Sequence, residues 1–514
     1  MAPRLDGCAH GAGPAGRRPA LMASLGRFAA TRLLAGVIGL LQVLLLARWM
    51  PVAEFASYSV LMAAMAVATV VGSLGVDRVL YRQLPLAHLA GASAEVLRLG
   101  RWALAARLAV ATPVAAAIVA VTGAPGGALG PLESMAFVAL LTATQVQADL
   151  SSATANALLR FEAQARITTT MLAVRLLAAW AVHLGPGGLS AEAVLVISIA
   201  GNLVQTGLVR WLAVRPALAA ALPAAGGPRY EAPPIRALAA ASGTNYLSYL
   251  FGLPWQGPTA TLIVGATAGA AETALFALLM NLMERTRQYL PLQLLQNAVE
   301  PALIRRYAVD GDHAAVARQV ELLRRANFGL LALVAVLCLA FGDQAIGALT
   351  AGKYAGGGTL AALMFAALAV RGVSGGLFIS ANVLGEMPAL TRIYGVVTLA
   401  ALPLLAWAAL RWGGSGVIVV SVLPSVLLWA GLRLRGWRCA LGVWRVDKDL
   451  LFVLSGGLAF GAGELALRAL AAPWALPCGA SASTVAYVAA SRLARAWRGV
   501  DLQRLREGLK GHAA

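Results

Sequence analysis

Four arginines stand in the middle of long apolar segments: Arg175, Arg285, Arg287 and Arg371. An ionised side chain at the centre of a bilayer costs about 2.5–3.5 kcal/mol even on the mildest scale, so four that faced lipid would cost on the order of 10 kcal/mol. We therefore expect these side chains to face a wet cavity or a partner. A guanidinium group stays charged and binds phosphate through two parallel hydrogen bonds, so the predicted chemistry is the binding of an anion such as a diphosphate.

Amides and carboxylates recur at helical spacing in the same segments. Gln145, Asp149 and Asn156 fall on one face of a helix predicted at 133–158, and Arg371 and Asn382 share a face of a helix predicted at 359–383. The predicted substrate-binding residues are Arg285, Arg287, Arg371, Arg175, Arg32, Asn245, Gln145, Asn156 and Asn382.

Two acidic residues could bind a coupling proton or cation, namely Asp149 and Glu284. Simpler roles stay open for all of these polar groups. The amides and hydroxyls could merely join helices by hydrogen bonds. Glu284 could neutralise Arg287 or bond to Gln288 within one turn, and Asp149 could pair with an arginine across the bundle.

Sequence motifs for enzymes and cofactors are absent. The chain has no Walker motif, HExxH, GxSxG or CxxC pair, which excludes ATP hydrolysis. Its 4 cysteines are far apart in the sequence and have no histidine at ligand spacing, so neither a disulfide framework nor a zinc site is expected. We predict no catalytic residue, no cofactor and no metal.

The elements that carry these residues are membrane-spanning helices. The chain has 514 residues, of which 60% are hydrophobic and 12% charged, whereas a soluble protein has about 25% charged residues. With about 20 apolar residues per span, we expect an all-α polytopic membrane protein of about 14 transmembrane helices. The expected parts are a disordered tail (1–27), a six-helix lobe (28–214), a linker (215–235), a second six-helix lobe (236–434), two additional helices (435–491) and a basic tail (492–514).

Most of the 41 Lys and Arg residues lie in alternate loops and in the two tails. The opposite loops hold only Arg48, Lys353, Arg411 and Arg468. This asymmetry predicts that both termini are cytoplasmic and that the protein lies in the cytoplasmic (inner) membrane. The net charge of +19 then needs no nucleic acid as a partner. The segment 305–325 is expected to be an amphipathic surface helix, and Met22 is a candidate start residue.

The chain also carries an internal repeat. LLLARWMPVAEFASYSVLMA (44–63) aligns with LIVGATAGAAETALFALLMN (262–281), which matches Glu54 to Glu272 and Leu61-Met62 to Leu279-Met280. A second echo matches the surroundings of Asn156 to those of Asn382. Repeats in a polytopic membrane protein are typical of transporters, in which two similar bundles rock about a site at their interface. We therefore expect the two lobes to be pseudo-symmetric.

These segments resemble the polysaccharide transporters of the O-antigen flippase type. The resemblance rests on LARWMPVAEFASYSVLMA with Pro51, Glu54, Phe55 and Tyr58, on LGVDRVLYRQLP, and on SANVLGEMP in the second half. It covers roughly residues 28–434. It implies the fold of the multidrug/oligosaccharidyl-lipid/polysaccharide exporter superfamily, alternating access, and a lipid-linked oligosaccharide on a polyprenyl diphosphate as the substrate. Such a flippase serves cell-surface polysaccharide synthesis, with membrane lipids and a polymerase or assembly proteins as partners.

Three other functions stay open. A span count of about 14 also resembles the lipid II flippases, which carry two extra helices. Multidrug exporters of the same superfamily are a second alternative, although the deep arginines outnumber deep acids here. A polytopic glycosyltransferase or polymerase is the third, and it would need catalytic groups on a sizeable outer loop, where this chain offers Asp343 and Lys353 in a short one.

Overall fold

The computed structural model describes residues 17–123, 130–158, 160–219, 249–290, 311–354, 356–438, 446–469 and 475–493, with a few single residues between these ranges. All regular elements within these residues are helices, which confirms the predicted all-α fold. Eight of the described helices are long and apolar enough to cross a membrane. The protein is therefore a multi-pass membrane protein.

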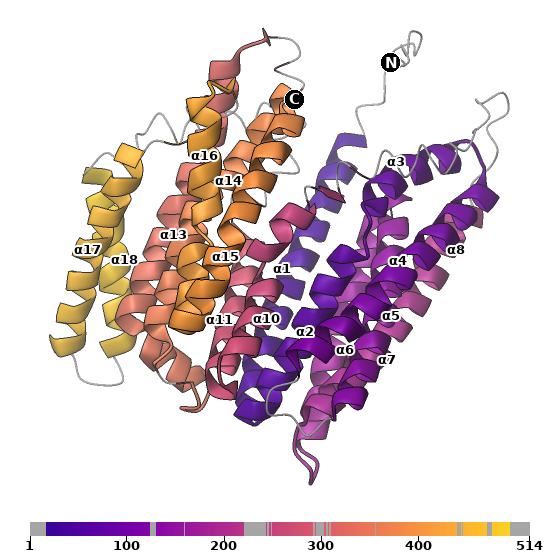
Figure 1. The fold of residues 1–514 in the computed structure, drawn as a ribbon, viewed down its shortest axis with the longest axis horizontal. Helices are drawn as coiled ribbons and strands as arrows, with labels where there is room; N and C mark the ends of the chain where they lie inside the picture. The colour runs from indigo at the N-terminus through magenta and orange to yellow at the C-terminus, as the bar shows by residue number, and fades with distance from the viewer. Residues whose placement is uncertain are drawn as a thin grey trace.

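Two helical lobes lie side by side (Figure 1). The N-terminal lobe contains α1 (Arg17–Trp49), α2 (Val52–Val71), α3 (Val76–Leu89), α4 (Ser93–Thr122), α5 (Pro131–Ala157), α6 (Phe161–His183), α7 (Ala191–Val209), the π-helix η1 (Arg210–Val214) and α8 (Arg215–Ala219). The C-terminal lobe contains the 3₁₀ helix η2 (Leu253–Trp255), α10 (Gly257–Thr267), α11 (Ala270–Arg287), α13 (His313–Leu349), α14 (Gly358–Leu384), α15 (Met387–Val420) and α16 (Leu423–Leu434).

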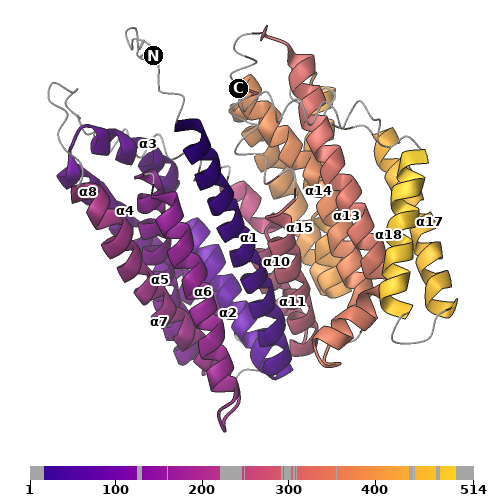
Figure 2. The same cartoon turned by 180° about the vertical axis from the view of Figure 1, so that it is seen from behind.

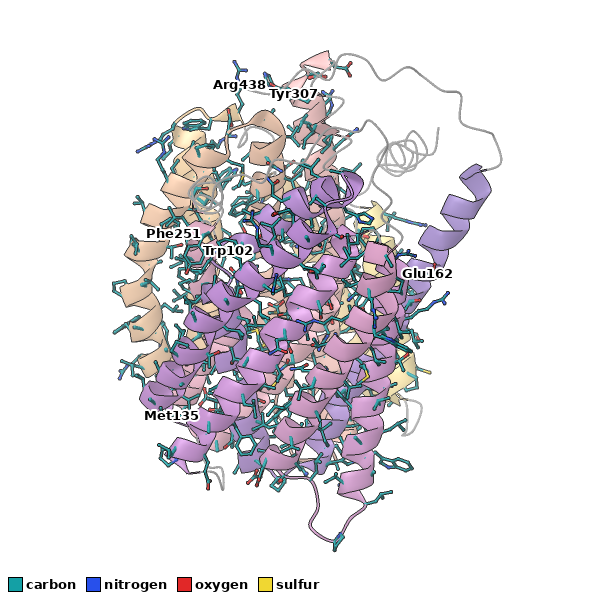
Figure 3. All side chains as sticks on the ribbon, turned by 90° about the vertical axis from the view of Figure 1, so that its right-hand side faces the viewer. Trp102, Met135, Glu162, Phe251, Tyr307 and Arg438 are labelled. Carbon is teal, nitrogen blue, oxygen red and sulfur yellow. The ribbon has the colours of Figure 1, made fainter. Side chains whose placement is uncertain are left out.

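Two further helices, α17 (Val446–Ala469) and α18 (Ala475–Leu493), stand at the outer edge of the C-terminal lobe (Figure 2). We call the end of the bundle where α1 begins the near end, and the end where α1 meets α2 the far end. Figure 3 marks both ends, with Met135 of α5 at the far end and Tyr307 and Arg438 at the near end.

Local signals set the ends of these helices. The Asp312 carboxylate accepts hydrogen bonds from the backbone N–H groups of Ala314 (2.8 Å) and Ala315 (3.1 Å), which satisfies two donors at the start of α13. α14 stops at Gly385, whose φ of 73° is readily adopted only by glycine. α15 turns sharply at Gly413 (φ 55°), so its last residues run back toward the near end with α16.

The matched glutamates perform the same task in both lobes. The Glu54 carboxylate in the first turn of α2 accepts a hydrogen bond from the backbone N–H of Ala191, where α7 begins (2.9 Å). The Glu272 carboxylate in the first turn of α11 accepts one from Gly414, where helix resumes after the turn in α15 (2.9 Å). Each carboxylate thereby caps a helix start that favours an anion. This equivalence supports the predicted pseudo-symmetry of the two lobes.

The structure differs from expectation at two places in the N-terminal lobe. α1 begins at Arg17, so part of the tail expected to be disordered is helical, while residues 1–16 lie outside the described residues. The segment after α2 forms a further helix, α3, which at 14 residues is shorter than a membrane span. Its residues Val76, Leu80 and Leu84 are buried at four-residue spacing, which is the pattern of a helix with one apolar face.

The segment 305–325 is not a separate surface helix in its described part, because residues 313–325 form the first turns of α13. Arg324 is 0% exposed there. Its guanidinium binds the Glu321 carboxylate (2.8 Å) and, through two hydrogen bonds of 2.9 and 3.0 Å, the Asp449 carboxylate of α17. The Trp444 indole N–H also donates to Asp449 (2.7 Å). This buried ion cluster joins the two added helices to the C-terminal lobe.

Candidate functional site

The N-terminal lobe contains a polar cavity where it meets α11 of the C-terminal lobe. The cavity volume is ≈ 130 Å³, and α1, α2, α5, α6, α7 and α11 contribute to its wall. Its polar lining consists of Gln42, Tyr58, Ser59, Gln145, Arg175, Ser198, Asn202, Asn281 and Arg285. Two of the four arginines selected from the sequence therefore line one cavity, as expected for charges that lipid would not accept.

Amides of α7 fix the position of Arg175. Its Nη2 donates hydrogen bonds to Asn202 Oδ1 (2.9 Å) and Gln205 Oε1 (3.2 Å). Asn202 is 2% exposed, and its Nδ2 donates in turn to Thr144 Oγ1 (3.3 Å). A Cβ atom at Gly201 would lie 2.3 Å from Arg175 Nε, so glycine gives the guanidinium its room. The cation is held rigidly rather than left free to reach lipid headgroups.

Arg285 enters the same space from the C-terminal lobe. Its guanidinium carbon would lie 3.3 Å from a Cβ atom at Gly39, so a second glycine, in α1, allows close approach. Tyr58 lies within electrostatic range of both Arg285 and Arg175. Cations from the two lobes therefore converge on one polar cavity that the Tyr58 side chain also lines.

Among the described residues, no carboxylate lines this cavity. One of the two predicted acids, Asp149, accepts a hydrogen bond from Gln145 Nε2 (2.9 Å) one turn away on α5. Two guanidinium groups in surroundings of low dielectric attract an anion strongly and repel a cation. The geometry thus suits a small anionic group, with amide and hydroxyl side chains available for further hydrogen bonds.

Arg371 lies away from the cavity, at a break in the helical backbone. One of its guanidinium N–H groups donates to the backbone carbonyl of Trp255 in η2. The Trp255 indole N–H donates to Thr398 Oγ1 (3.0 Å), and that hydroxyl donates to the carbonyl of Phe251 (3.1 Å). A helix break leaves carbonyls without partners, and inside a membrane protein these need other donors. α14 and α15 supply them here.

Glu284 and Arg287 form an ion pair within one turn of α11, with Arg287 Nε 3.3 Å from Glu284 Oε2. This ion pair agrees with the simpler interpretation that Glu284 neutralises Arg287, and the coupling role of Glu284 stays a prediction. Both groups lie within electrostatic range of Arg371. They form a second polar cluster, in which the charge of Arg287 is already balanced, whereas no carboxylate among the described residues lines the cavity next to Arg175 and Arg285.

The other predicted residues are distributed as follows. Asn156 lies on α5, and its Oδ1 is buried with no hydrogen-bond partner among the described residues. Asn382 is exposed on α14. The Arg32 side chain and Asn245 lie outside the described parts of the structure. A common site for all nine predicted residues is therefore not visible, and their binding roles stay predictions.

Asn202 and Gln205, which hold Arg175, are not among the residues predicted from the sequence. They stand three residues apart in an apolar segment, on one face of a helix, which is the same kind of signal that selected Gln145 and Asp149. The residues that position Arg175 can thus be found by the helical-spacing criterion that selected Gln145 and Asp149.

Solved structures of transporters share this architecture. The lipid II flippase MurJ in an inward closed conformation superposes with a TM-score of 0.62, at 11% identity, over 91% of this chain and 98% of that one. A multidrug resistance MATE family transporter of the MOP superfamily, in an inward-facing conformation, gives a TM-score of 0.51 at 15% identity, over 78% of this chain and 95% of its own.

The MATE multidrug transporter DinF-BH gives a TM-score of 0.50 at 14% identity, over 81% of this chain and 95% of that one. The chain has the fold of these transporters. The predicted fold of two helical lobes is therefore confirmed. No protein-family model and no curated protein matches the sequence.

Proposed function

We propose that this protein is a flippase that moves a polyprenyl-diphosphate-linked oligosaccharide across the cytoplasmic membrane by alternating access. In this proposal both termini are cytoplasmic, so the near end faces the cytoplasm and the far end faces outward. The diphosphate of the substrate is the group that the arginines bind, and the protein transports it without chemical change.

The convergence of Arg175 and Arg285 on a cavity whose described lining has no carboxylate carries the proposal. Diphosphate has two or more negative charges, and guanidinium groups bind its oxygens in pairs. The two lobes each contribute one of these arginines, so binding would connect them, as alternating access about an interface requires.

The individual roles are assigned here as part of the proposal. Arg175 and Arg285 contact the diphosphate, with Gln145 beside them. Arg287, Arg371 and Arg32 guide the charged headgroup along the lobe interface, and Asn156, Asn382 and Asn245 bind sugar hydroxyls. Asp149 and Glu284 are the candidates for a coupling proton or cation.

A lipid II-type substrate is the second candidate. It is favoured by the length over which the fold agrees with MurJ, which covers 91% of this chain. Lipid II and an O-antigen precursor share the diphosphate and differ in the sugar. A cationic drug is disfavoured because two cations and no described carboxylate line the cavity.

The test is translocation of a fluorescent polyprenyl-diphosphate oligosaccharide in proteoliposomes. Replacing Arg285 with Ala removes one of the two cavity cations, and we expect flipping to slow by about tenfold or more, the effect of losing one charge-assisted hydrogen bond. Arg285→Lys keeps the charge but loses the paired N–H donors of the guanidinium group, so it should retain part of the activity.

Arg98→Ala is the matched control. That side chain is 61% exposed on α4 and pairs with Glu95, so its loss should leave flipping unchanged. Equal flipping by Arg285→Ala and the wild type would contradict the site. Transfer or polymerisation of the sugar, detected by chromatography of the lipid products, would instead assign the chain to the enzymes.

A further inference from the structure

The turn between α13 and α14 reaches across to the N-terminal lobe at the far end. Lys353 in this turn donates hydrogen bonds from Nζ to the backbone carbonyls of Arg48 (2.6 Å) and Met50 (2.9 Å). These carbonyls lie at the C-terminal end of α1. Carbonyl groups at a helix end lack helical partners, and a cation is favoured there. One side chain thus attaches the C-terminal lobe to the end of α1.

The next residue, Tyr354, is inserted beside the first turn of α2. It is 3% exposed, and its ring centre lies 6.2 Å from that of Phe55. The Phe55 ring lies 6.3 Å from the Tyr58 ring, and both Phe55 and Tyr58 line the cavity that holds the two arginines. A row of three aromatic rings therefore connects the turn at the far end to the cavity.

The backbone holds this turn in a fixed and slightly strained shape. Ala351 has a φ of 55°, a region that costs a residue with a side chain about 1–2 kcal/mol. The Asp343 carboxylate accepts a hydrogen bond from the backbone N–H of Gly358 (2.6 Å), which ties the start of α14 to α13. The shape directs Lys353 and Tyr354 toward the N-terminal lobe.

The charge on Lys353 is held at some cost. Partial burial, and secondly the Arg48 guanidinium, lower the pKa of the Lys353 ammonium. The two hydrogen bonds of Lys353 have a well-defined geometry, but their contribution to the free energy is modest. Such a contact can open and close.

We propose that Lys353 and Tyr354 are the gate at the far end of the cavity, and that opening toward this side requires Lys353 to leave α1 and Tyr354 to leave Phe55. The proposal depends on the proposed function only in assuming that the lobes separate at the far end. It names no substrate, so it can be tested without one.

The experiment measures how fast a cysteine in the cavity reacts with a membrane-impermeant maleimide added from the far side of proteoliposomes. Ser59→Cys places the thiol in the cavity wall, in a chain whose 4 native cysteines are replaced by serine. Lys353→Met keeps the length of the side chain and removes both hydrogen bonds. We expect it to raise the reaction rate at least about tenfold, as the loss of a charge-assisted contact would.

Two variants serve as controls for the lysine. Arg411→Met removes another basic residue in a predicted far-end loop, an exposed one, and should leave the rate unchanged. Lys353→Arg retains a donor and should give an intermediate rate. Equal rates for Lys353→Met and Arg411→Met would overturn the gate.

Tyr354 gives an independent check. Its hydroxyl is buried with no hydrogen-bond partner among the described residues, so Tyr354→Phe should leave the labelling rate unchanged, whereas Tyr354→Ala should raise it. Labelling that responds to these variants in a protein that flips no lipid would keep the gate and reject the proposed substrate. Normal flipping, combined with labelling rates that do not respond to substitution of Lys353 or Tyr354, would reject the gate and keep the proposed substrate.

Discussion

The deep arginines are held in three different ways, and the partner decides what each can do. Arg175 is bound by neutral amides, so its positive charge remains available to a ligand. Arg287 is bound by a carboxylate, which cancels its charge. Arg371 is bound by a backbone carbonyl at a helix break. We therefore expect Arg175 and Arg285 to bind the anion directly, and Arg371 to support the fold in addition to any contact with the substrate.

Replacing Arg371 with Met should therefore lower stability more than it lowers affinity for the substrate. The Trp255 carbonyl would lose its donor, and a buried carbonyl without a partner costs about 1–3 kcal/mol. We expect that decrease in the free energy of unfolding, measured by denaturant titration in detergent. Arg371→Lys keeps a donor and should lose less. Wild-type stability combined with lost substrate binding would show instead that Arg371 contacts the substrate.

At the scale of the helix, the two lobes use the same capping carboxylate. Glu54 and Glu272 each accept a backbone N–H at the start of another helix in their own lobe. The second site is more crowded, because the chain turns at Gly413 and a Cβ atom there would lie 2.2 Å from Glu272 Oε1. The two caps have the same role, but the cap at Glu272 leaves less room for a larger side chain nearby.

The two caps predict a matched pair of effects. Glu54→Ala and Glu272→Ala should each lower the free energy of unfolding by about 1 kcal/mol, the usual cost of a lost helix cap. Gly413→Ala should cost more than Gly123→Ala in thermal unfolding. Both positions have positive φ (55° and 71°), but at Gly123 no atom lies within 4 Å of the added methyl group. Equal costs would show that the Glu272 contact does not matter.

At the scale of the whole molecule, α17 and α18 belong to the C-terminal lobe. The Arg324–Asp449 ion pair joins α13 to α17, and the Tyr487 hydroxyl of α18 donates to the carbonyl of Gly329 in α13 (2.6 Å). Breaking one side of a buried ion pair costs about 3–5 kcal/mol, so this joint does not open during ordinary motion. The added helices must then move with the lobe they rest on.

Spin labels at exposed positions test this prediction. We expect the distance between labels at Val485 (α18) and Leu399 (α15) to stay constant when substrate is added. The distance between Leu399 and Val121 (α4) should change, because it spans the two lobes. A change in the distance between Val485 and Leu399 on addition of substrate would contradict the assignment of α18 to the C-terminal lobe.

The sequence predicted what depends on local composition. Apolar length and basic loops indicated the spans, and the deep arginines and their stripes indicated which helices carry polar groups. It did not predict partners that are distant in the chain. Arg324 was assigned to a surface helix because its partner Asp449 is 125 residues away. The contact between Arg371 and the Trp255 carbonyl was not predicted either, because the two residues are 116 positions apart.

The Arg324–Asp449 pair also bears on how the chain is made. Asp449 is 125 residues after Arg324, so at about 5–20 residues per second it leaves the ribosome roughly 6–25 s later. During that interval Arg324 has Glu321 of its own helix as a carboxylate partner, while the surface that later receives α17 is uncovered. A nascent chain that stops between these two residues carries an unfinished, polar surface into the bilayer, and that is a feature by which quality-control proteases could distinguish it from the completed protein.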